Sequence, residues 1–137
     1  MKIFIDIGHP AHVHYFRNFI EIMLNRGHLF LVTARDKDVT HNLLDSYGIE
    51  YINRGAGGKG VIGKFLYMIR ADYDILKLSR KFRPDVFISF SSPYAAQVSR
   101  LLCTPHIAFT DTEHATLGNL AFSPFSRKIL TPNCFEK

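Results

Sequence analysis

Three histidines lie within six residues near the N-terminus, in the segment GHPAHVH of residues 8–14. Histidine both ligates metals and transfers protons near neutral pH, so this spacing admits two kinds of chemistry. One is a metal site of the pattern H-x-x-H-x-H, built from His9, His12 and His14. The other is a ligand crevice in which one histidine acts as a general base.

Helix geometry argues against the metal site. If a helix begins near Pro10, successive residues rotate by about 100°, so His12 and His14 point to nearly opposite sides. Zinc-binding histidines on a helix stand one turn apart, and Asp111 and Glu113 would have to complete the site from another strand. The sequence therefore predicts no metal site, and we expect no cofactor.

His12 is the favoured general base. It falls in the first turn of its helix, at the edge of the buried stripe, where it would face the crevice. A histidine with a pKa near neutral is suited to take a proton from a bound hydroxyl. His9 is either a polar loop residue before a proline or a residue that lines the crevice. His14 is predicted to be solvated or to cap the helix.

A sheet must position these residues, and the sequence alternates short apolar runs with longer segments of helical period. Because parallel strands need long crossovers, this alternation predicts an α/β fold: a Rossmann-like open parallel sheet with helices on both faces. The predicted strands are Lys2–Ile7, Leu29–Thr33, Glu50–Ile52, Asp85–Phe90, His106–Thr110 and a sixth at Lys128–Leu130.

Three helices are predicted between these strands. The first carries one apolar stripe and ends at Arg26-Gly27, the second covers about Lys37–Tyr47, and the third about Val61–Phe82. Apolar residues of the third helix spread well beyond one stripe. This favours a thickly buried crossover helix over a helix that lies on a membrane surface.

Ligands of open α/β sheets bind beyond the carboxyl ends of the strands, where the strand order reverses. Ser91 and Ser92 precede a helix that starts near Pro93, whose N-terminus attracts an anion, although Ser-Ser-Pro is also an ordinary helix start. Asp111 and Glu113 are second candidates for proton transfer, or carboxylates that cap the next helix. The residues expected to contact substrate are Gly8, His9, Ser91, Ser92 and His114.

Residues 54–60, RGAGGKG, formally satisfy G-x-G-x-x-G. The motif follows the third predicted strand instead of the first, and no acidic residue closes a strand about twenty residues later, as a dinucleotide site requires. Lys59 is followed by glycine, so the segment is not a Walker loop either. It is interpreted as a mobile loop, with substrate contact as the alternative.

The 137-residue length predicts one domain, and the net charge of +5 favours anionic partners. Nucleic acid is disfavoured because the aromatic residues occupy core-facing positions. Cys103 and Cys134 have no metal or redox spacing, which is typical of a reduced cytoplasmic protein. No segment has the length of a signal peptide or membrane span, so we expect a cytoplasmic protein, soluble or peripheral at a membrane.

Several segments resemble one family: IDIGHPAHVHYFRNFI, LVTARDK, DVFISFSSPYAAQVSRLL, IAFTDTEHATLGNLAFSPF and the final ILTP. Together they cover essentially the whole chain and resemble domain of unknown function 354. That family is similar to the N-terminal half of GT-B glycosyltransferases and of UDP-N-acetylglucosamine 2-epimerases.

Two details separate these relatives. Ala11-His12-Val13 resembles the Gly-His-Val at the first strand end of the N-acetylglucosaminyltransferase that completes the lipid-linked peptidoglycan precursor. Where the epimerases carry Gly-Thr-Arg-Pro-Glu, this chain has Gly8-His9-Pro10-Ala11-His12, and only Thr112-Glu113-His114-Ala115 is similar to their acidic loop. The resemblance to the epimerases is therefore the weaker one.

The resemblance implies that residues 1–137 are one Rossmann-like domain, the acceptor-side half of a two-domain glycosyltransferase. Its partners would be a nucleotide-sugar donor, a glycan or lipid-linked acceptor, and a missing C-terminal domain. Because the isolated chain would hold half an active site, we expect it to be inactive alone. The alternatives are an epimerase-like half and a non-catalytic module that binds a sugar phosphate or a partner subunit.

Overall fold

The computed structural model describes residues 1–111 and 116–133. Within these residues one parallel sheet has the strand order β3-β2-β1-β4-β5-β6, so the order reverses between β1 and β4. The predicted Rossmann-like open sheet is confirmed. Its strands are β1 (Lys2–Ile7), β2 (Leu29–Asp36), β3 (Ile52–Ala56), β4 (Val86–Phe90), β5 (His106–Phe109) and β6 (Lys128–Leu130).

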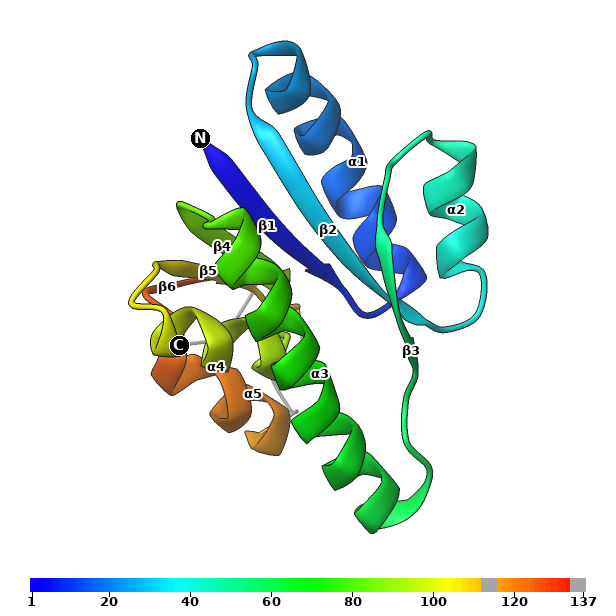
Figure 1. Cartoon of the computed structure of the whole chain (residues 1–137), viewed down its shortest axis with the longest axis vertical. Coiled ribbons are helices and arrows are strands. Elements are labelled where there is room, and N and C mark those ends of the chain that lie inside the picture. Colours follow the sequence, from blue (N-terminus) through cyan, green and yellow to red (C-terminus); the bar gives the residue numbers. More distant parts are fainter. Residues whose placement is uncertain (112–115, 134–137) are drawn as a thin grey trace.

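Helices cover both faces of this sheet (Figure 1). On one face lie α1 (Pro10–Asn25) and α2 (Thr40–Ser46). On the other lie α3 (Gly60–Phe82), α4 (Pro93–Leu101) and α5 (Thr116–Phe122), and a short 3₁₀ turn, η1 (Ser123–Phe125), follows α5.

The central strand β1 is buried on both faces, as a strand between two helical layers must be. Its odd-numbered isoleucines pack into the core under α1, and Phe4 packs on the opposite face against α3 and α4. This alternation also turns Asp6 toward the α3 face, because side chains two apart share a face of a strand. The residues of β1 and α1 in the first core are Ile3, Ile5, Ile7, Val13, Phe16 and Ile20.

Local side chains set the ends of α1. The His9 Nδ1 accepts a hydrogen bond of 3.2 Å from the N–H of Ala11, and Pro10 takes the first helical position, where no N–H is needed. The helix ends at Arg26, and Gly27 follows with a φ of +79°. The predicted end of this helix is confirmed.

Three predicted elements have boundaries that are wrong by more than one residue. The third strand is Ile52–Ala56 and not Glu50–Ile52, so it includes part of the glycine-rich segment that was interpreted as a loop. The second strand extends past Thr33 to Asp36. The second helix begins at Thr40 and not at Lys37, because the preceding turn places Asp38 at a φ of +50°.

The predicted thick burial of the third helix is also wrong. In α3 the buried residues are Ala71, Ile75 and Ser79, all in its second half. The first half extends past the carboxyl ends of the strands (Figure 1), so no sheet surface is available to cover it. The large apolar residues that stay exposed there are Val61, Ile62, Phe65, Leu66 and Ile69.

No helix in the described part of the chain is both long enough and apolar enough to cross a membrane. Cys103 is exposed and has a φ of +52°, whereas Cys134 lies outside the described residues.

Candidate functional site

His12 lies at the switch point of the sheet, where β1 and β4 end side by side. The N–H of Gly8 donates a 3.3 Å hydrogen bond to its Nδ1, and its ring stacks on Phe90 at a centroid distance of 4.7 Å. Because Nδ1 accepts this bond, the neutral ring carries its proton on Nε2. Within residues 1–111 and 116–133 we find no hydrogen-bond partner for Nε2.

The His12 ring is neutral at physiological pH. Burial lowers its pKa to about 4, the neighbouring His9 acts in the same direction, and the carboxylates of Asp6 and Asp111 oppose the shift. A neutral imidazole is the form that can accept a proton. The low pKa also makes the ring a weak base. It can therefore take a proton from a substrate hydroxyl only if that hydroxyl becomes more acidic as the reaction proceeds.

The three N-terminal histidines do not converge. His9 caps α1, with its ring centroid 5.9 Å from that of His12. His14 faces α2, where its Nδ1 lies 3.3 Å from the hydroxyl of Tyr47. The capping role considered for His14 thus belongs to His9. Among the residues that the structure describes, no three His, Cys, Asp or Glu side chains are grouped so as to hold a metal ion.

An aromatic shelf, defined here as Tyr15, Phe90 and Phe109, adjoins His12. The Tyr15 ring meets Phe90 edge-on at 5.1 Å and lies 5.6 Å from Phe109, and Tyr15 is 57% exposed. Aromatic faces of this kind suit the apolar side of a sugar or base. No sequence pattern predicted the shelf, although Phe90 and Phe109 are the last residues of two adjacent strands.

A buried ion pair lies beneath this edge of the sheet. Asp6 is wholly buried, and its carboxylate accepts hydrogen bonds from Arg54 Nε at 2.8 Å and Arg54 Nη2 at 3.1 Å. The hydroxyls of Thr33 and Ser92 donate to the same carboxylate at 2.8 Å and 2.5 Å. Asp6 therefore ties β1 to β2, β3 and the start of α4. A carboxylate inside an apolar strand was the sequence signal for such a pair.

Arg54 completes this cluster from within the glycine-rich segment. Its Nη1 donates to the hydroxyl of Tyr67 at 2.5 Å, and its guanidinium lies 4.9 Å from the ring centroid of Tyr94. Burial lowers the pKa of Arg54, but Asp6, Tyr67 and Tyr94 together exceed this effect, so the pKa of Arg54 is raised. Arg54 is thus a structural cation of β3 and not a loop residue.

Ser91 and Ser92 are engaged inside the fold. The Ser92 hydroxyl donates to Asp6 and accepts from the N–H of Ala95 at 3.4 Å, which caps α4. The Ser91 hydroxyl donates to the carbonyl of Phe109 at 3.1 Å. Both hydroxyls therefore fix the ends of β4 and β5, and neither is left free to meet an anion.

The acidic loop is described only at its start. Asp111 is exposed beyond β5, and its charge reaches His12. Glu113 and His114 lie outside the described residues.

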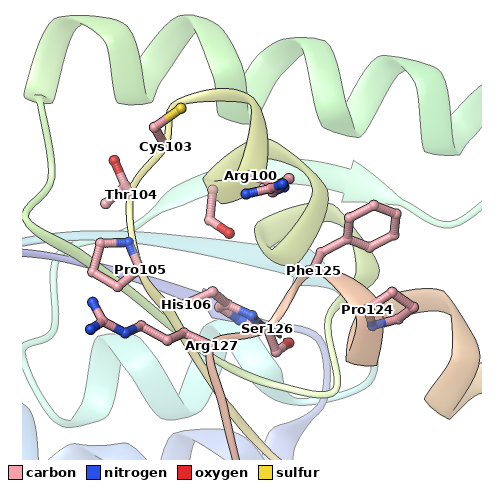
Figure 2. Close-up of a pocket in the computed structure, with 10 residues that line it drawn as sticks. Arg100, Cys103, Thr104, Pro105, His106, Pro124, Phe125, Ser126 and Arg127 are labelled. Carbon is pink, nitrogen blue, oxygen red and sulfur yellow. Dashed lines mark hydrogen bonds between the residues drawn. The ribbon is translucent and has the colours of Figure 1, made fainter.

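A separate pocket of about 340 Å³ lies at the opposite, amino end of β5, between the end of α4 and η1 (Figure 2). His106 lines it, with Nε2 at 2.9 Å from the Ser89 hydroxyl and Nδ1 at 2.8 Å from the Ser126 hydroxyl. This pocket does not adjoin His12.

The model of the family described as Protein of unknown function (DUF354) matches residues 1–137. The chain belongs to this family. It is 26% identical over 132 residues to the uncharacterized protein MJ0665 of Methanocaldococcus jannaschii, covering 96% of this chain and 39% of that protein.

Solved structures with the same fold are GT-B glycosyltransferases and UDP-GlcNAc 2-epimerases. MurG of Acinetobacter baumannii has a TM-score of 0.75 at 15% identity, over 100% of this chain and 44% of MurG. A UDP-GlcNAc 2-epimerase of Neisseria meningitidis, solved with UDP-GlcNAc, has a TM-score of 0.76 at 11% identity, over 96% of this chain and 40% of the epimerase. This chain thus spans less than half the length of the proteins it matches.

Proposed function

We propose that this domain is the acceptor-side half of a GT-B-type glycosyltransferase that uses a nucleotide-sugar donor. The observation that carries the proposal is the placement of His12. Its ring is neutral, rests on the aromatic shelf at the switch point of the sheet, and keeps Nε2 available. This is where an open α/β sheet binds its ligand.

In the proposed step an acceptor hydroxyl lies against Nε2 of His12. The acceptor oxygen bonds to the anomeric carbon, the bond from that carbon to the diphosphate breaks, and the nucleoside diphosphate leaves with the electron pair. The hydroxyl proton passes to Nε2, so the ring must first move its own proton to Nδ1. That exchange gives up the bond from Gly8, which at 3.3 Å is long and therefore weak. Asp111 and Glu113 are proposed to help orient the acceptor.

The direct test is acceptor-dependent release of nucleoside diphosphate by the full-length protein that contains this domain. Replacing His12 by alanine should lower turnover at least about a hundredfold. His14→Ala is the matched control, because His14 stands on the same helix and faces α2. Near-normal turnover in His12→Ala would remove the assignment.

The pH profile gives an independent check. Since a protonated His12 cannot accept a proton, turnover should fall as the pH drops through about 4, the pKa that burial gives this ring. An acid limb centred near 6.5 would mean that the ring is solvated during turnover.

An epimerase is the second candidate, since the TM-scores of the epimerase and MurG matches are equal within 0.01. The two activities differ in their need for an acceptor. Conversion of UDP-GlcNAc at its C2 position without any acceptor, followed by NMR, would favour the epimerase.

We also propose that the first half of α3 contacts an anionic membrane surface, which would suit a lipid-linked acceptor. Phe65 and Leu66 are exposed there, as is the preceding Lys64, and no acidic residue occurs between Glu50 and Asp72. Phe65→Ser/Leu66→Ser should reduce co-sedimentation with anionic vesicles, whereas Leu101→Ser, at another exposed leucine, should not. Equal co-sedimentation of both variants would contradict the contact.

A further inference from the structure

A second pocket lies on the α3 side of the sheet, beyond the carboxyl ends of β2 and β3. Its volume is about 350 Å³. Two cations, Arg35 and Lys64, line it together with the phenols of Tyr67 and Tyr94, and Phe65 and Met68 form an apolar wall. Gly57 and Gly58 of the glycine-rich segment also line it, whereas the substrate contacts expected at the ends of β1 and β4 do not.

Arg35 is held in place with no ionic partner among the residues that the structure describes. Its guanidinium lies 5.9 Å from the ring centroid of Tyr67 and packs so closely on Gly57 that a Cβ there would stand 2.0 Å from Nη2. Its Nε is buried and has no hydrogen-bond partner in the described part of the chain. A buried donor left unpaired is costly unless something binds it, so the arrangement calls for an acceptor group in the pocket.

The neighbouring arginine shows the contrast. Arg54, on the adjacent strand, has Asp6 as a buried counter-ion and a hydroxyl partner in Tyr67. Arg35 faces no carboxylate among the residues that line the pocket, and Lys64 adds a second positive charge. The lining of the pocket therefore carries an excess of positive charge, which no carboxylate of that lining neutralises.

The chemistry of the lining identifies the ligand class. A planar guanidinium donates two parallel hydrogen bonds to phosphoryl oxygens, an ammonium supplies a point charge, and a phenol adds a neutral donor. Burial raises the pKa of Tyr94, so its hydroxyl keeps its proton at neutral pH. Phe65 and Met68 cannot hydrogen-bond to an inorganic anion, but they can pack against an organic group that is attached to the phosphoryl group.

We propose that this pocket binds the phosphoryl group of an organic phosphate ester, with Arg35 and Lys64 as its cations and Tyr94 as its neutral donor. The binding does not depend on glycosyl transfer. Assigning the ester to the acceptor is a further step that rests on the proposed function.

Calorimetric titration of the full-length protein with phenyl phosphate and with inorganic phosphate tests the proposal. Phenyl phosphate should bind at least about tenfold more tightly than inorganic phosphate, because only the ester reaches the apolar wall. Arg35→Met and Lys64→Met should each weaken phenyl phosphate binding by about tenfold. Arg100→Met, which removes an arginine from the other pocket, is the control and should leave the Kd within about twofold.

Gly57→Ala provides a variant that keeps every charge. The added methyl displaces the Arg35 guanidinium, whose flexible end can move, so the domain should stay folded while phenyl phosphate binding weakens. Thermal unfolding of each variant checks the fold, and if Arg35→Met does not fold, Gly57→Ala and Lys64→Met decide.

Three results would overturn the proposal: no saturable binding of phenyl phosphate at millimolar concentration, an unchanged Kd in Gly57→Ala and Lys64→Met, or equal binding of inorganic phosphate and phenyl phosphate. The titration involves no turnover, so its failure would leave glycosyl transfer untouched. Failure of the transfer assay would likewise leave this pocket standing.

Discussion

Two histidines stand at opposite ends of the same sheet, His106 wholly buried and His12 partly buried, and they differ in their hydrogen-bond partners. Burial lowers the pKa of both His12 and His106 to about 4, so both rings are neutral at physiological pH. Both nitrogens of His106 have hydroxyl partners, in Ser89 and Ser126. Within residues 1–111 and 116–133, His12 has one hydrogen-bond partner, the N–H of Gly8, which donates to Nδ1. A shifted pKa alone therefore does not identify a functional histidine. What distinguishes the two rings is whether their second nitrogen has a hydrogen-bond partner.

The hydrogen-bond directions around His106 are all determined. The Ser126 hydroxyl donates to the carbonyl of Phe122, so its oxygen accepts from His106 Nδ1–H. His106 Nε2 then accepts from the Ser89 hydroxyl, whose oxygen accepts from the N–H of Ser92. Ser92 in turn donates to Asp6. His106 is thus one member of a buried network that runs to Asp6, whereas His12 stands outside it.

The largest effect is expected from breaking this network at its ion pair. Arg54→Met leaves the wholly buried Asp6 carboxylate without its counter-ion, which should cost about 3–5 kcal/mol of unfolding free energy in urea titrations. Arg70→Met removes an exposed arginine that pairs with Asp74 and should cost less than about 0.5 kcal/mol. A similarly small loss in Arg54→Met would mean that the pair does not hold this edge of the sheet together.

The two histidines themselves should separate by stability. His106→Ala leaves a cavity and removes the partner of the buried Ser89 hydroxyl and of the partly buried Ser126 hydroxyl, and should cost about 3 kcal/mol. His12→Ala removes one weak bond and a stacked ring, and should cost about 1 kcal/mol. Urea titration at pH 7.5 measures both. An equal loss of unfolding free energy at the two positions would show that His12 stabilises the fold as much as His106 does.

Acid should weaken the fold between about pH 6.5 and pH 4. In this window His12 and His106 bind protons in the unfolded state but not in the folded state. The free energy of unfolding therefore falls as the pH drops, by at most about 3 kcal/mol for each ring. His106→Gln removes one titrating ring and should flatten the curve of unfolding free energy against pH. A curve with unchanged slope would show that His106 is not the ring that resists protonation.

A smaller effect of opposite sign is expected at Asp72. Burial raises its pKa to about 6, Arg54 opposes the shift, and its Oδ1 is buried with no partner in the described part of the chain. Stability is therefore lost as the pH rises from 3.8 through 6. Because Asp72 is partly solvated, Asp72→Asn should add only about 1 kcal/mol at pH 8 and nothing near pH 4. Destabilisation at pH 8 would contradict the unpaired carboxylate.

Much of the fold follows from the sequence because it depends on periodicity. The apolar run Lys2–Ile7, the stripe of the first helix and the glycine at its end each determine local structure through neighbouring residues. The alternation of these elements leaves few topologies open. The boundary of β3 could not be predicted in this way. Arg54 lies in this strand and pairs with Asp6, which is 48 positions away in the sequence.

The candidate site was less visible for the same reason. The position of His12 beside the switch point follows from helix geometry, but its stacking on Phe90 and the choice of tautomer depend on contacts between β1 and β4. The bond from the Ser92 hydroxyl to Asp6 could not be predicted, because the two residues are distant in the sequence. The exposure of the first half of α3 depends on where the sheet stops, which no local pattern reveals.

The most direct test of the account is to compare acceptor-dependent release of nucleoside diphosphate in His12→Ala and His106→Ala of the full-length protein, per folded molecule. We expect a loss of at least about a hundredfold in His12→Ala and nearly normal turnover in His106→Ala. If His12→Ala keeps its turnover within a few fold of the unchanged protein, His12 is not the general base, and the reaction does not depend on this residue at the carboxyl end of the sheet.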